Sequence, residues 1–194
     1  MQLATRDTRI SAEEYLEAEK TSLEKHEYVD GKVYAMAGAG DNHGNLVAEL
    51  LTNLVVHLRS SKCETFASDM KVRATENVFY YPDVLVSCEE NPDDAYFRNR
   101  PILIIEVTSP STERIDRAEK LFYYLQIPSL LEYVIVAQRA MSVEVHRRQP
   151  NGGWAIHYYA GGEDAVELSS VDLTIPLSEL YRRVRFENNA NRAE

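Results

Sequence analysis

Two carboxylates stand inside strongly apolar stretches of this sequence. Asp83 lies in YYPDVLVS (residues 80–87), directly after a proline, and Glu106 lies in PILIIEVTSPST (101–112). Burying a carboxylate is costly unless it is paired, protonated or bound to a metal ion. Carboxylate oxygens suit Mg²⁺, which takes one or two of them from a protein and leaves its other positions to water and phosphate. The pair therefore indicates a site for Mg²⁺, with Mn²⁺ as its substitute, if the fold brings the two residues together.

Both stretches are predicted strands, and strand geometry decides whether the carboxylates meet. Alternate residues of a strand share one face, so Glu106 lies on the face of Ile104 and Thr108, close to the end of its strand. Asp83 lies at the start of its own strand. If the two strands are antiparallel neighbours, the start of one meets the end of the other. Both carboxylates then reach the same edge of the sheet.

A lysine follows on the next predicted helix, STERIDRAEKLFYYLQI (111–127). Asp116 and Lys120 are four residues apart and share one face of that helix. Spacing alone favours an ordinary surface ion pair, worth a few tenths of a kcal/mol. The alternative is that Lys120 points over the carboxylates, where its ammonium stabilises charge on a phosphate or orients a water molecule. The apolar periodicity predicts the buried face of this helix, which consists of Ile115, Ala118, Phe122 and Leu125.

The remaining elements indicate one domain over residues 1–186, of mixed α/β (α+β) class, with a central mixed sheet flanked by helices. Ser11 and Glu14 form a capping box that starts a short helix, and Asp30-Gly31 predicts a tight hairpin within residues 26–36. A long amphipathic helix begins at Asn42 or His43. Further strands are expected near 63–73, 78–88, 101–108, 130–136, 142–148 and 153–160, with a short helix near 177–183. The tail 187–194 is expected to be disordered.

Composition bounds the class of protein. The chain has 194 residues, of which 44% are hydrophobic and 27% charged, as in an ordinary globular domain. No stretch approaches the roughly 18 apolar residues of a membrane span, and the N-terminus lacks the apolar core of a signal peptide. Cys63 and Cys88 lack metal-ligand spacing, so neither a zinc site nor a disulfide is expected, and a reducing cytoplasm is the predicted location.

The net charge of −10 argues weakly against a general polyanion binder, because phosphate contacts supply most non-specific affinity for nucleic acid. It leaves room for a local basic site. RRVR (182–185) holds three arginines, and other basic residues gather around Arg139, Arg147 and Arg148.

Four motifs in this order resemble the PD-(D/E)xK nuclease superfamily, which has the restriction-endonuclease-like fold. They are PDV (82–84), IEVTSPST (105–112), DRAEK (116–120) and EYVIV (132–136). More closely, the chain resembles the Uma family of bacterial restriction-endonuclease-like proteins. The similarity runs from residue 10 to residue 181. It includes HEYVDGKVYAMAGAGDNH (26–43), which is similar to the family's glutamate-bearing hairpin.

The resemblance implies a role for each of five residues. Asp83 and Glu106 would bind the metal ion, together with the carbonyl oxygen of Val107. Lys120 would be the catalytic lysine, and Glu27 would be an accessory acid from the N-terminal hairpin.

The chain departs from the superfamily pattern at one position. The superfamily lysine stands two residues after the glutamate, where this sequence has Thr108. The Uma-type pattern also lacks a lysine there and takes it from the following helix. Lys120 can fill that role only if its helix packs over the end of the strand.

Several other polar residues allow more than one interpretation. His43 is either a helix-start residue or a functional group near the site, and Asp69 is more simply a charge at a strand edge than a supporting carboxylate. Four tyrosines could form a base-stacking platform, but strand and helix tyrosines more often belong to the core. These are Tyr80, Tyr81, Tyr123 and Tyr124.

Three functions compete. The first is a metal-dependent DNA endonuclease that hydrolyses phosphodiester bonds. The second is a catalytically silent scaffold of the same fold that binds DNA or protein; the acidic charge favours it, whereas buried carboxylates disfavour it. The third is a hydrolase of smaller phosphate esters, which would need a closed pocket rather than an open groove.

A homodimer is expected for a small nuclease that cuts both strands, because two active sites are then related by a two-fold axis. The predicted interface is the hairpin 142–160, whose aromatic residues exceed what a monomer surface needs. They are Trp154, Tyr158 and Tyr159.

Overall fold

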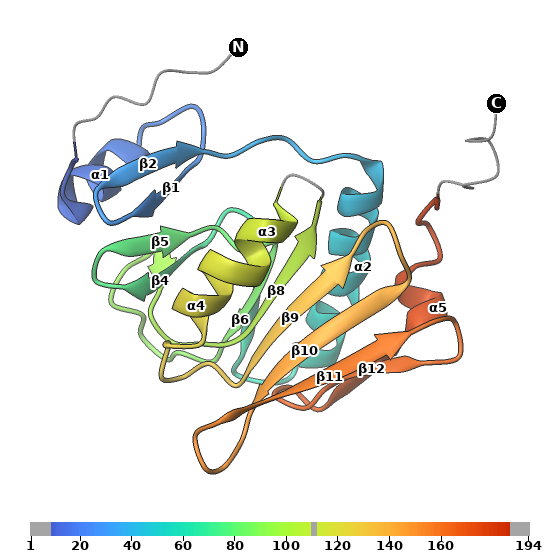
Figure 1. Cartoon of the computed structure of the whole chain (residues 1–194). Coiled ribbons are helices and arrows are strands. Elements are labelled where there is room, and N and C mark those ends of the chain that lie inside the picture. Colours follow the sequence, from blue (N-terminus) through green and yellow to red (C-terminus); the bar gives the residue numbers. More distant parts are fainter. Residues whose placement is uncertain (1–8, 110–111, 187–194) are drawn as a thin grey trace, which may run out of the picture.

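The computed structural model describes residues 9–109 and 112–186. A six-stranded sheet lies between a long helix on one side and a chain of short helical turns on the other (Figure 1). The helical segments are α1 (Ala12–Glu19), α2 (Asp41–Leu58), α3 (Glu113–Ile115), the π-helical turn η1 (Asp116–Lys120), α4 (Leu121–Tyr124) and α5 (Leu177–Leu180). The strands are β1 (His26–Val29), β2 (Lys32–Ala35), β3 (Glu64–Ala67), β4 (Lys71–Thr75), β5 (Val78–Tyr80), β6 (Val84–Ser87), β7 (Phe97–Arg98), β8 (Pro101–Thr108), β9 (Glu132–Ala137), β10 (Ser142–Arg148), β11 (Trp154–Ala160), β12 (Ala165–Leu168) and β13 (Leu173–Pro176).

The central sheet has the strand order β11-β10-β9-β8-β6-β3. β8 and β9 are parallel, and β6 pairs with β8 in the antiparallel direction, which is the condition that the sequence analysis set for the two carboxylates to meet. Two predicted strands are each divided in two, because Pro82 interrupts residues 78–88 and a turn at Met70 interrupts residues 63–73. The second halves of these stretches lie in different sheets from the first halves.

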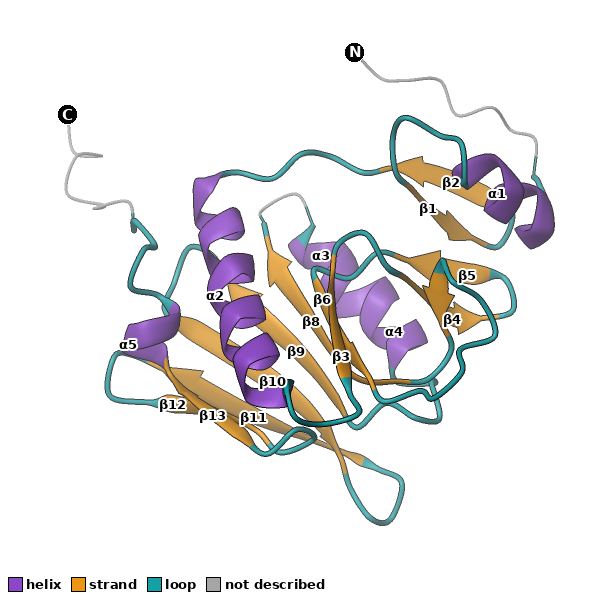
Figure 2. Ribbon diagram, turned by 180° about the vertical axis from the view of Figure 1, so that it is seen from behind, coloured by secondary structure: helices purple, strands orange, loops and turns teal. Residues whose placement is uncertain are grey.

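The long helix α2 covers one face of the central sheet (Figure 2). Its leucines at 3–4 spacing pack against the inward side chains of the sheet, which include Ile105 and Val107 of β8. The leucines are Leu46, Leu50, Leu54 and Leu58, and all four are buried. α2 and β8 therefore form a rigid core at the strand that carries Glu106.

The segment 113–124 covers the opposite face, but most of the apolar face that its periodicity predicted is not buried. Ile115, Ala118 and Phe122 are exposed, and only Leu125 packs against the core. The buried positions are Asp116, Lys120 and Tyr124. The reason lies in the sheet beneath, where β8 and β10 present Glu106 and Glu144, both buried. Polar groups on the sheet require polar partners on the helix, so the helix turns its charged face inward.

A smaller sheet of order β2-β1-β5-β4-β7 carries the N-terminal hairpin. The predicted capping box is present at the start of α1, where Ser11 and Glu14 bond reciprocally. The predicted turn is present too: Asp30 and Gly31 both have positive φ, of 47° and 91°, which is the tight hairpin geometry. β12 and β13 form a separate two-stranded antiparallel sheet, which the sequence analysis did not predict.

The prediction of two separate cysteines is wrong. β3 and β6 pair with Glu64 opposite Ser87, so Cys63 and Cys88 form the next cross-strand pair, and their sulfur atoms are bonded. The sequence could not show this, because the two residues are 25 positions apart and meet only through the strand pairing. The predicted cytoplasmic location loses the support that free cysteines gave it.

Some predictions lie outside the structural description. The tail 187–194 and positions 110–111 of the quoted motif are not among the described residues. The boundary of a single domain at residue 186 stays a prediction. In the part of the chain that is described, no helix is both long and apolar enough to cross a membrane.

Reduction of the Cys63–Cys88 bond is expected to lower the free energy of unfolding by about 2–4 kcal/mol, because the bond restricts the unfolded chain. Urea unfolding with and without dithiothreitol measures the difference. The Cys63→Ser, Cys88→Ser double variant is the control, since its unfolding should not respond to the reductant. Equal wild-type stability under both conditions would contradict the bond.

Candidate active site

The two carboxylates meet at one edge of the central sheet. Val84 pairs with Ile105 and Leu85 with Ile104, so Asp83 stands opposite Glu106 when this register is continued by one residue. The N–H of Val107 donates to Oδ2 of Asp83 at 2.7 Å, which ties the start of β6 to the end of β8. The sequence-based expectation that strand geometry brings these residues together is met.

Glu106 is 3% exposed and is held by two donors. The Lys120 ammonium lies 3.0 Å from Oε1, and the Tyr124 hydroxyl donates to the same oxygen at 2.9 Å. Lys120 and Tyr124 are four residues apart and reach the sheet from one helical face. Oε2 of Glu106 accepts no hydrogen bond from the described residues.

Lys120 is not a surface residue. Its side chain is 9% exposed, and its ammonium lies 2.9 Å from Oε1 of Glu27 and 3.8 Å from Oδ1 of Asp116. The predicted pairing with Asp116 is therefore its longest ion pair, and Glu27 of β1 and Glu106 of β8 lie closer to the ammonium. Of the two interpretations of this lysine, the structure agrees with the one that points it over the carboxylate edge.

Glu27 reaches the site from β1 of the N-terminal hairpin. Besides pairing with Lys120, its Oε1 accepts the backbone N–H of Tyr81 at 3.4 Å. The structure thus brings all four predicted side chains into one cluster: Glu27, Asp83, Glu106 and Lys120. They come from β1 of the hairpin, the residue just before β6, β8 and η1.

The electrostatics of the cluster are dominated by burial and an excess of acids. Burial raises the pKa of the Glu106 carboxyl well above its ordinary value. The Lys120 ammonium opposes this rise, whereas three neighbouring carboxylates add to it, those of Asp83, Asp116 and Glu27. Burial lowers the pKa of Lys120, but the surrounding carboxylates outweigh it and raise that pKa above its ordinary value.

His43 also belongs to the cluster. It lies in the first turn of α2, and its Nε2 is 3.0 Å from Oδ2 of Asp83. This hydrogen bond raises the pKa of His43, against the opposing effect of burial. The helix-start position was visible in the sequence, but the contact with Asp83 was not, because it spans 40 residues.

Sequence reasoning did not assign Tyr124 to the site. Tyr80 and Tyr81 are also buried, so these tyrosines form core and site walls rather than an exposed stacking platform. The available signal was the spacing of four between Lys120 and Tyr124, which places both on one helical face. Asp69 lies outside the cluster: it pairs with Lys25, and its side chain is 84% exposed.

The residues present fit a hard divalent cation. Within residues 9–109 and 112–186, no group of three or more His, Cys, Asp or Glu side chains is arranged to hold a metal ion. A cation at this edge would rest on two carboxylates plus backbone and water oxygens, which is the usual pattern for Mg²⁺. Asp83 and Glu106 each keep one oxygen that accepts no hydrogen bond from the described residues. The surplus of buried acids over bases further favours a cation there.

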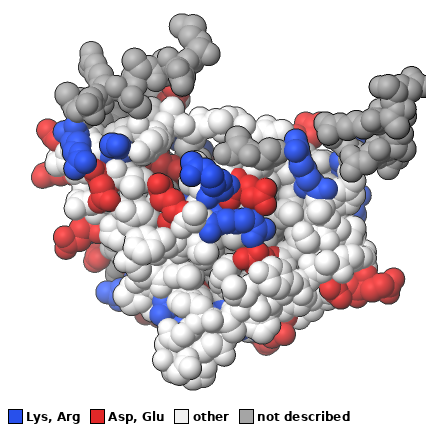
Figure 3. All heavy atoms as spheres, viewed as in Figure 1, with Lys and Arg blue, Asp and Glu red and all other residues white. Residues whose placement is uncertain are grey.

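Positive and negative side chains share the surface on this side of the molecule. Figure 3 shows Lys and Arg side chains near the middle of the face, with Asp and Glu side chains beside and between them. The excess of acids is not confined to a separate region of this face. A polyanion would therefore meet local groups of basic residues.

Sequence comparisons find relatives that are similar to this chain over most of its length. A family model described as "Uma2: Putative restriction endonuclease" matches residues 12–178. Two uncharacterized proteins of Synechocystis sp. strain PCC 6803 are also similar. One, slr1290, is 36% identical over 180 residues, which cover 92% of this chain and 94% of that protein. The other, sll1609, is 32% identical over 164 residues, which cover 82% and 93%.

A solved structure has the same fold. The crystal structure of "a putative nuclease belonging to DUF820" from Anabaena variabilis superposes with a TM-score of 0.72 and 17% sequence identity. The match covers 89% of this chain and 98% of that one. The mixed α+β fold of nuclease type that the sequence predicted is confirmed.

Proposed function

The chain belongs to the Uma2 family, whose model is described as "Putative restriction endonuclease", and we propose that it is a metal-dependent DNA endonuclease that hydrolyses phosphodiester bonds. The observation that carries this proposal is the buried cluster in which Lys120 bridges Glu27 and Glu106 at the edge that also holds Asp83. Two carboxylates and an ammonium at one sheet edge are the groups that phosphodiester hydrolysis needs. Structure alone would not require them in a core.

In this proposal, Asp83 and Glu106 hold Mg²⁺, or Mn²⁺ in its place, together with the carbonyl oxygen of Val107. Bound there, the metal ion would supply positive charge to the oxygens of the phosphate. The free oxygen of each carboxylate is available for it, because the other is taken by the protein. His43 and the N–H of Val107 hold Asp83, and Tyr124 with Lys120 holds Glu106.

Lys120 would act on the substrate rather than on the metal ion. An ammonium has three N–H donors, and two of them are directed to Glu27 and Glu106. The third is free to donate to a phosphate oxygen or to the attacking water. The role of Glu27 is then to fix the position of Lys120. Lys120 takes the place of the superfamily's strand lysine, since this chain has Thr108 at that position.

The alternative proposal is a scaffold protein that has the same fold, binds DNA or protein and does not catalyse hydrolysis. It is favoured by the net charge of −10, which weakens general affinity for DNA. It gives no reason for burying Glu106 beneath Lys120, because an apolar pair of similar volume is often at least as stable as a buried ion pair. The endonuclease is therefore the preferred proposal.

A cleavage assay tests this function. Plasmid and single-stranded DNA are incubated with wild-type protein and Mg²⁺, Mn²⁺ or EDTA, and cutting is expected only with a metal ion. Lys120→Ala should lower the rate about 10²-fold or more, the scale of losing one preorganised donor. Lys62→Ala is the matched control, because it removes a lysine that is paired with Glu90 on the surface. Its rate should stay within about twofold of the wild-type rate, since exposed pairs contribute little.

Loss of folding must be separated from loss of chemistry in this assay. Removing Lys120 leaves Glu27 and Glu106 without their cation, so rates are compared below the unfolding midpoints of both proteins. Adding Thr108→Lys to Lys120→Ala returns an ammonium to the usual superfamily position and should restore part of the rate. A Lys120→Ala rate equal to that of wild type, or no cutting by wild type with any metal ion, would favour the scaffold.

We also propose that the protein acts as a homodimer through β11. This strand forms an edge of the central sheet, and Ile156 and Tyr158 on its outer face are 50% and 70% exposed. Trp154 and Tyr159, also expected at the surface, are partly buried and pack instead against the core. Light scattering should give twice the 22.1 kDa of one chain, and Ile156→Glu, Tyr158→Glu should give the monomer mass. A wild-type mass of one chain at micromolar concentration would refute the dimer.

A further inference from the structure

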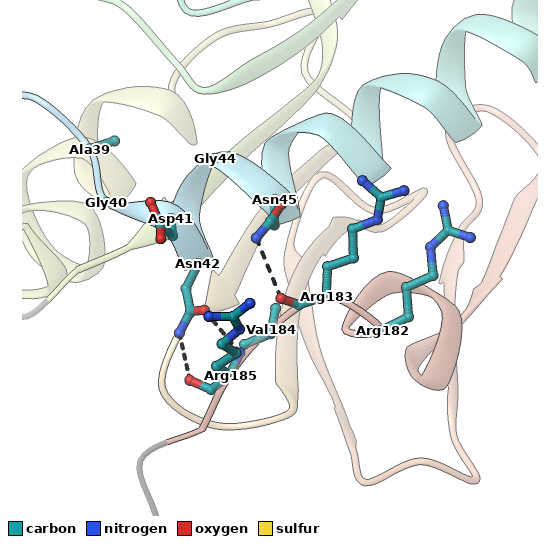
Figure 4. Close-up of a pocket in the computed structure, with 10 residues that line it drawn as sticks. All are labelled: Ala39, Gly40, Asp41, Asn42, Gly44, Asn45, Arg182, Arg183, Val184 and Arg185. Carbon is teal, nitrogen blue, oxygen red and sulfur yellow. Dashed lines mark hydrogen bonds between the residues drawn. The ribbon is translucent and has the colours of Figure 1, made fainter.

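A cavity of about 750 Å³ lies between the first turns of α2 and the segment Arg182–Arg185. Figure 4 shows the two walls facing each other, with the α2 residues on one side and the arginine segment on the other. Gly40 and Gly44 line the helical wall, and apart from their chain neighbours and the adjacent helix backbone no atom lies within 4 Å of the place where a Cβ would stand on either of them. The glycines leave this wall open to a ligand.

Two asparagines of α2 fix the arginine segment. Asn42 donates to the carbonyl of Arg185 at 2.9 Å and accepts the N–H of the same residue at 2.9 Å. Asn45 donates to the carbonyl of Arg183 at 3.4 Å. The backbone that carries the arginines is therefore held in place before any ligand arrives.

The charge of the cavity is positive, though partly compensated. The Arg182 guanidinium lies 2.8 Å from Oε1 of Glu49, and Nε of Arg183 lies 3.7 Å from the same oxygen. Glu49 lies outside the lining, whereas Asp41 is an acid of the lining itself. The guanidinium of Arg185 has no partner among the described residues, and Figure 4 shows it beside Asn42. Three guanidinium groups against two carboxylates leave one positive charge in excess.

The helical wall adds backbone donors to these guanidinium groups. The first intrahelical bond runs from the N–H of Gly44 to the carbonyl of Gly40, so the N–H groups before it have no helical partner. Gly40 supplies no side-chain cap. Guanidinium groups beside free N–H groups match the oxygens of a phosphate.

The cavity and the candidate active site share one turn of α2. Asn42, Gly44 and Asn45 line the cavity, while His43 between them bonds Asp83. A group bound in the cavity would therefore contact the same turn of α2 that carries His43, the partner of Asp83. We propose that the cavity binds a backbone phosphate of the DNA substrate, one other than the phosphate that is cleaved. This assignment rests on the endonuclease function proposed above and names the part of the substrate that the RRVR segment holds.

The test is binding of a fluorescein-labelled DNA duplex, measured by anisotropy in EDTA so that no DNA is cut, over a range of salt concentrations. The variants are Arg185→Ala and Arg183→Ala, Arg185→Ala. Arg182 is left in place, because its loss would remove the closest partner of the buried Glu49. Arg59→Ala is the matched control: Arg59 is exposed at the other end of α2, which is about 27 Å away at 1.5 Å per residue.

The double variant should bind about tenfold more weakly at low salt, and its slope of log affinity against log salt should be shallower by about one. Arg59→Ala should keep the wild-type affinity and slope. In the cleavage assay the double variant should raise KM and leave kcat near wild type, since it loses binding common to substrate and transition state.

Two results would overturn the assignment in different ways. If the double variant binds the duplex with the wild-type affinity and salt slope, the cavity does not bind a DNA phosphate. The proposed endonuclease function would be unaffected by that result. If the wild-type protein neither binds the duplex nor cuts DNA with Mg²⁺ or Mn²⁺, both the phosphate site in the cavity and the proposed endonuclease function are refuted.

Discussion

The ammonium of Lys120 lies between Glu106 of the central sheet and Glu27 of the N-terminal hairpin. The lysine side chain is only 9% exposed. It connects three parts of the fold, because η1 supplies the lysine and two separate sheets supply the acids. A buried ion pair is weak evidence for stability, since the cost of removing two charges from water can exceed their attraction. Its position at the end of β8, opposite Asp83, suits the proposed hydrolysis.

The π-helical turn η1 has a clear reason in this setting. Single π-turns within helices are rare overall, and those that occur are often found at functional sites. Arg117 and Lys120 both lie in η1, and they reach Glu144 and Glu106 of the sheet. These two acids stand in one row of the sheet, because Ile135 of β9 pairs with each of them. The helix is thereby fixed to the sheet by charges at two points, which leaves Ile115 and Phe122 exposed.

Much of the site could be predicted from local rules. Alternation along β8 assigned Glu106 to its face, and an antiparallel neighbour was enough to bring Asp83 opposite to it. The long helix α2 and the Asp30-Gly31 hairpin followed from periodicity and turn chemistry. These features depend on a few neighbouring residues or on one strand pairing, so the sequence contains what determines them.

The features that escaped prediction depend on distant partners. The inward face of residues 113–124 is decided by the acids of β8 and β10, which apolar spacing within the helix does not record. The contact of His43 with Asp83 and the Cys63–Cys88 bond each require the tertiary fold. Pro82 shows a different case: the proline is visible in the sequence, but residues 78–88 were predicted as one strand, and their division between two sheets depends on the tertiary fold.

The carboxylate pair of Asp83 and Glu106 is tested most directly by titrating Mn²⁺ into the protein and measuring the bound ion. Wild type should bind one or two ions, and the Asp83→Asn, Glu106→Gln variant should lose them while it keeps its fold, because removing two like charges relieves repulsion. Asp69→Asn is the control, since that carboxylate is exposed and remote from the cluster, and it should bind Mn²⁺ as wild type does. Equal Mn²⁺ binding by wild type and the Asp83→Asn, Glu106→Gln variant would contradict a metal site at this edge of the sheet.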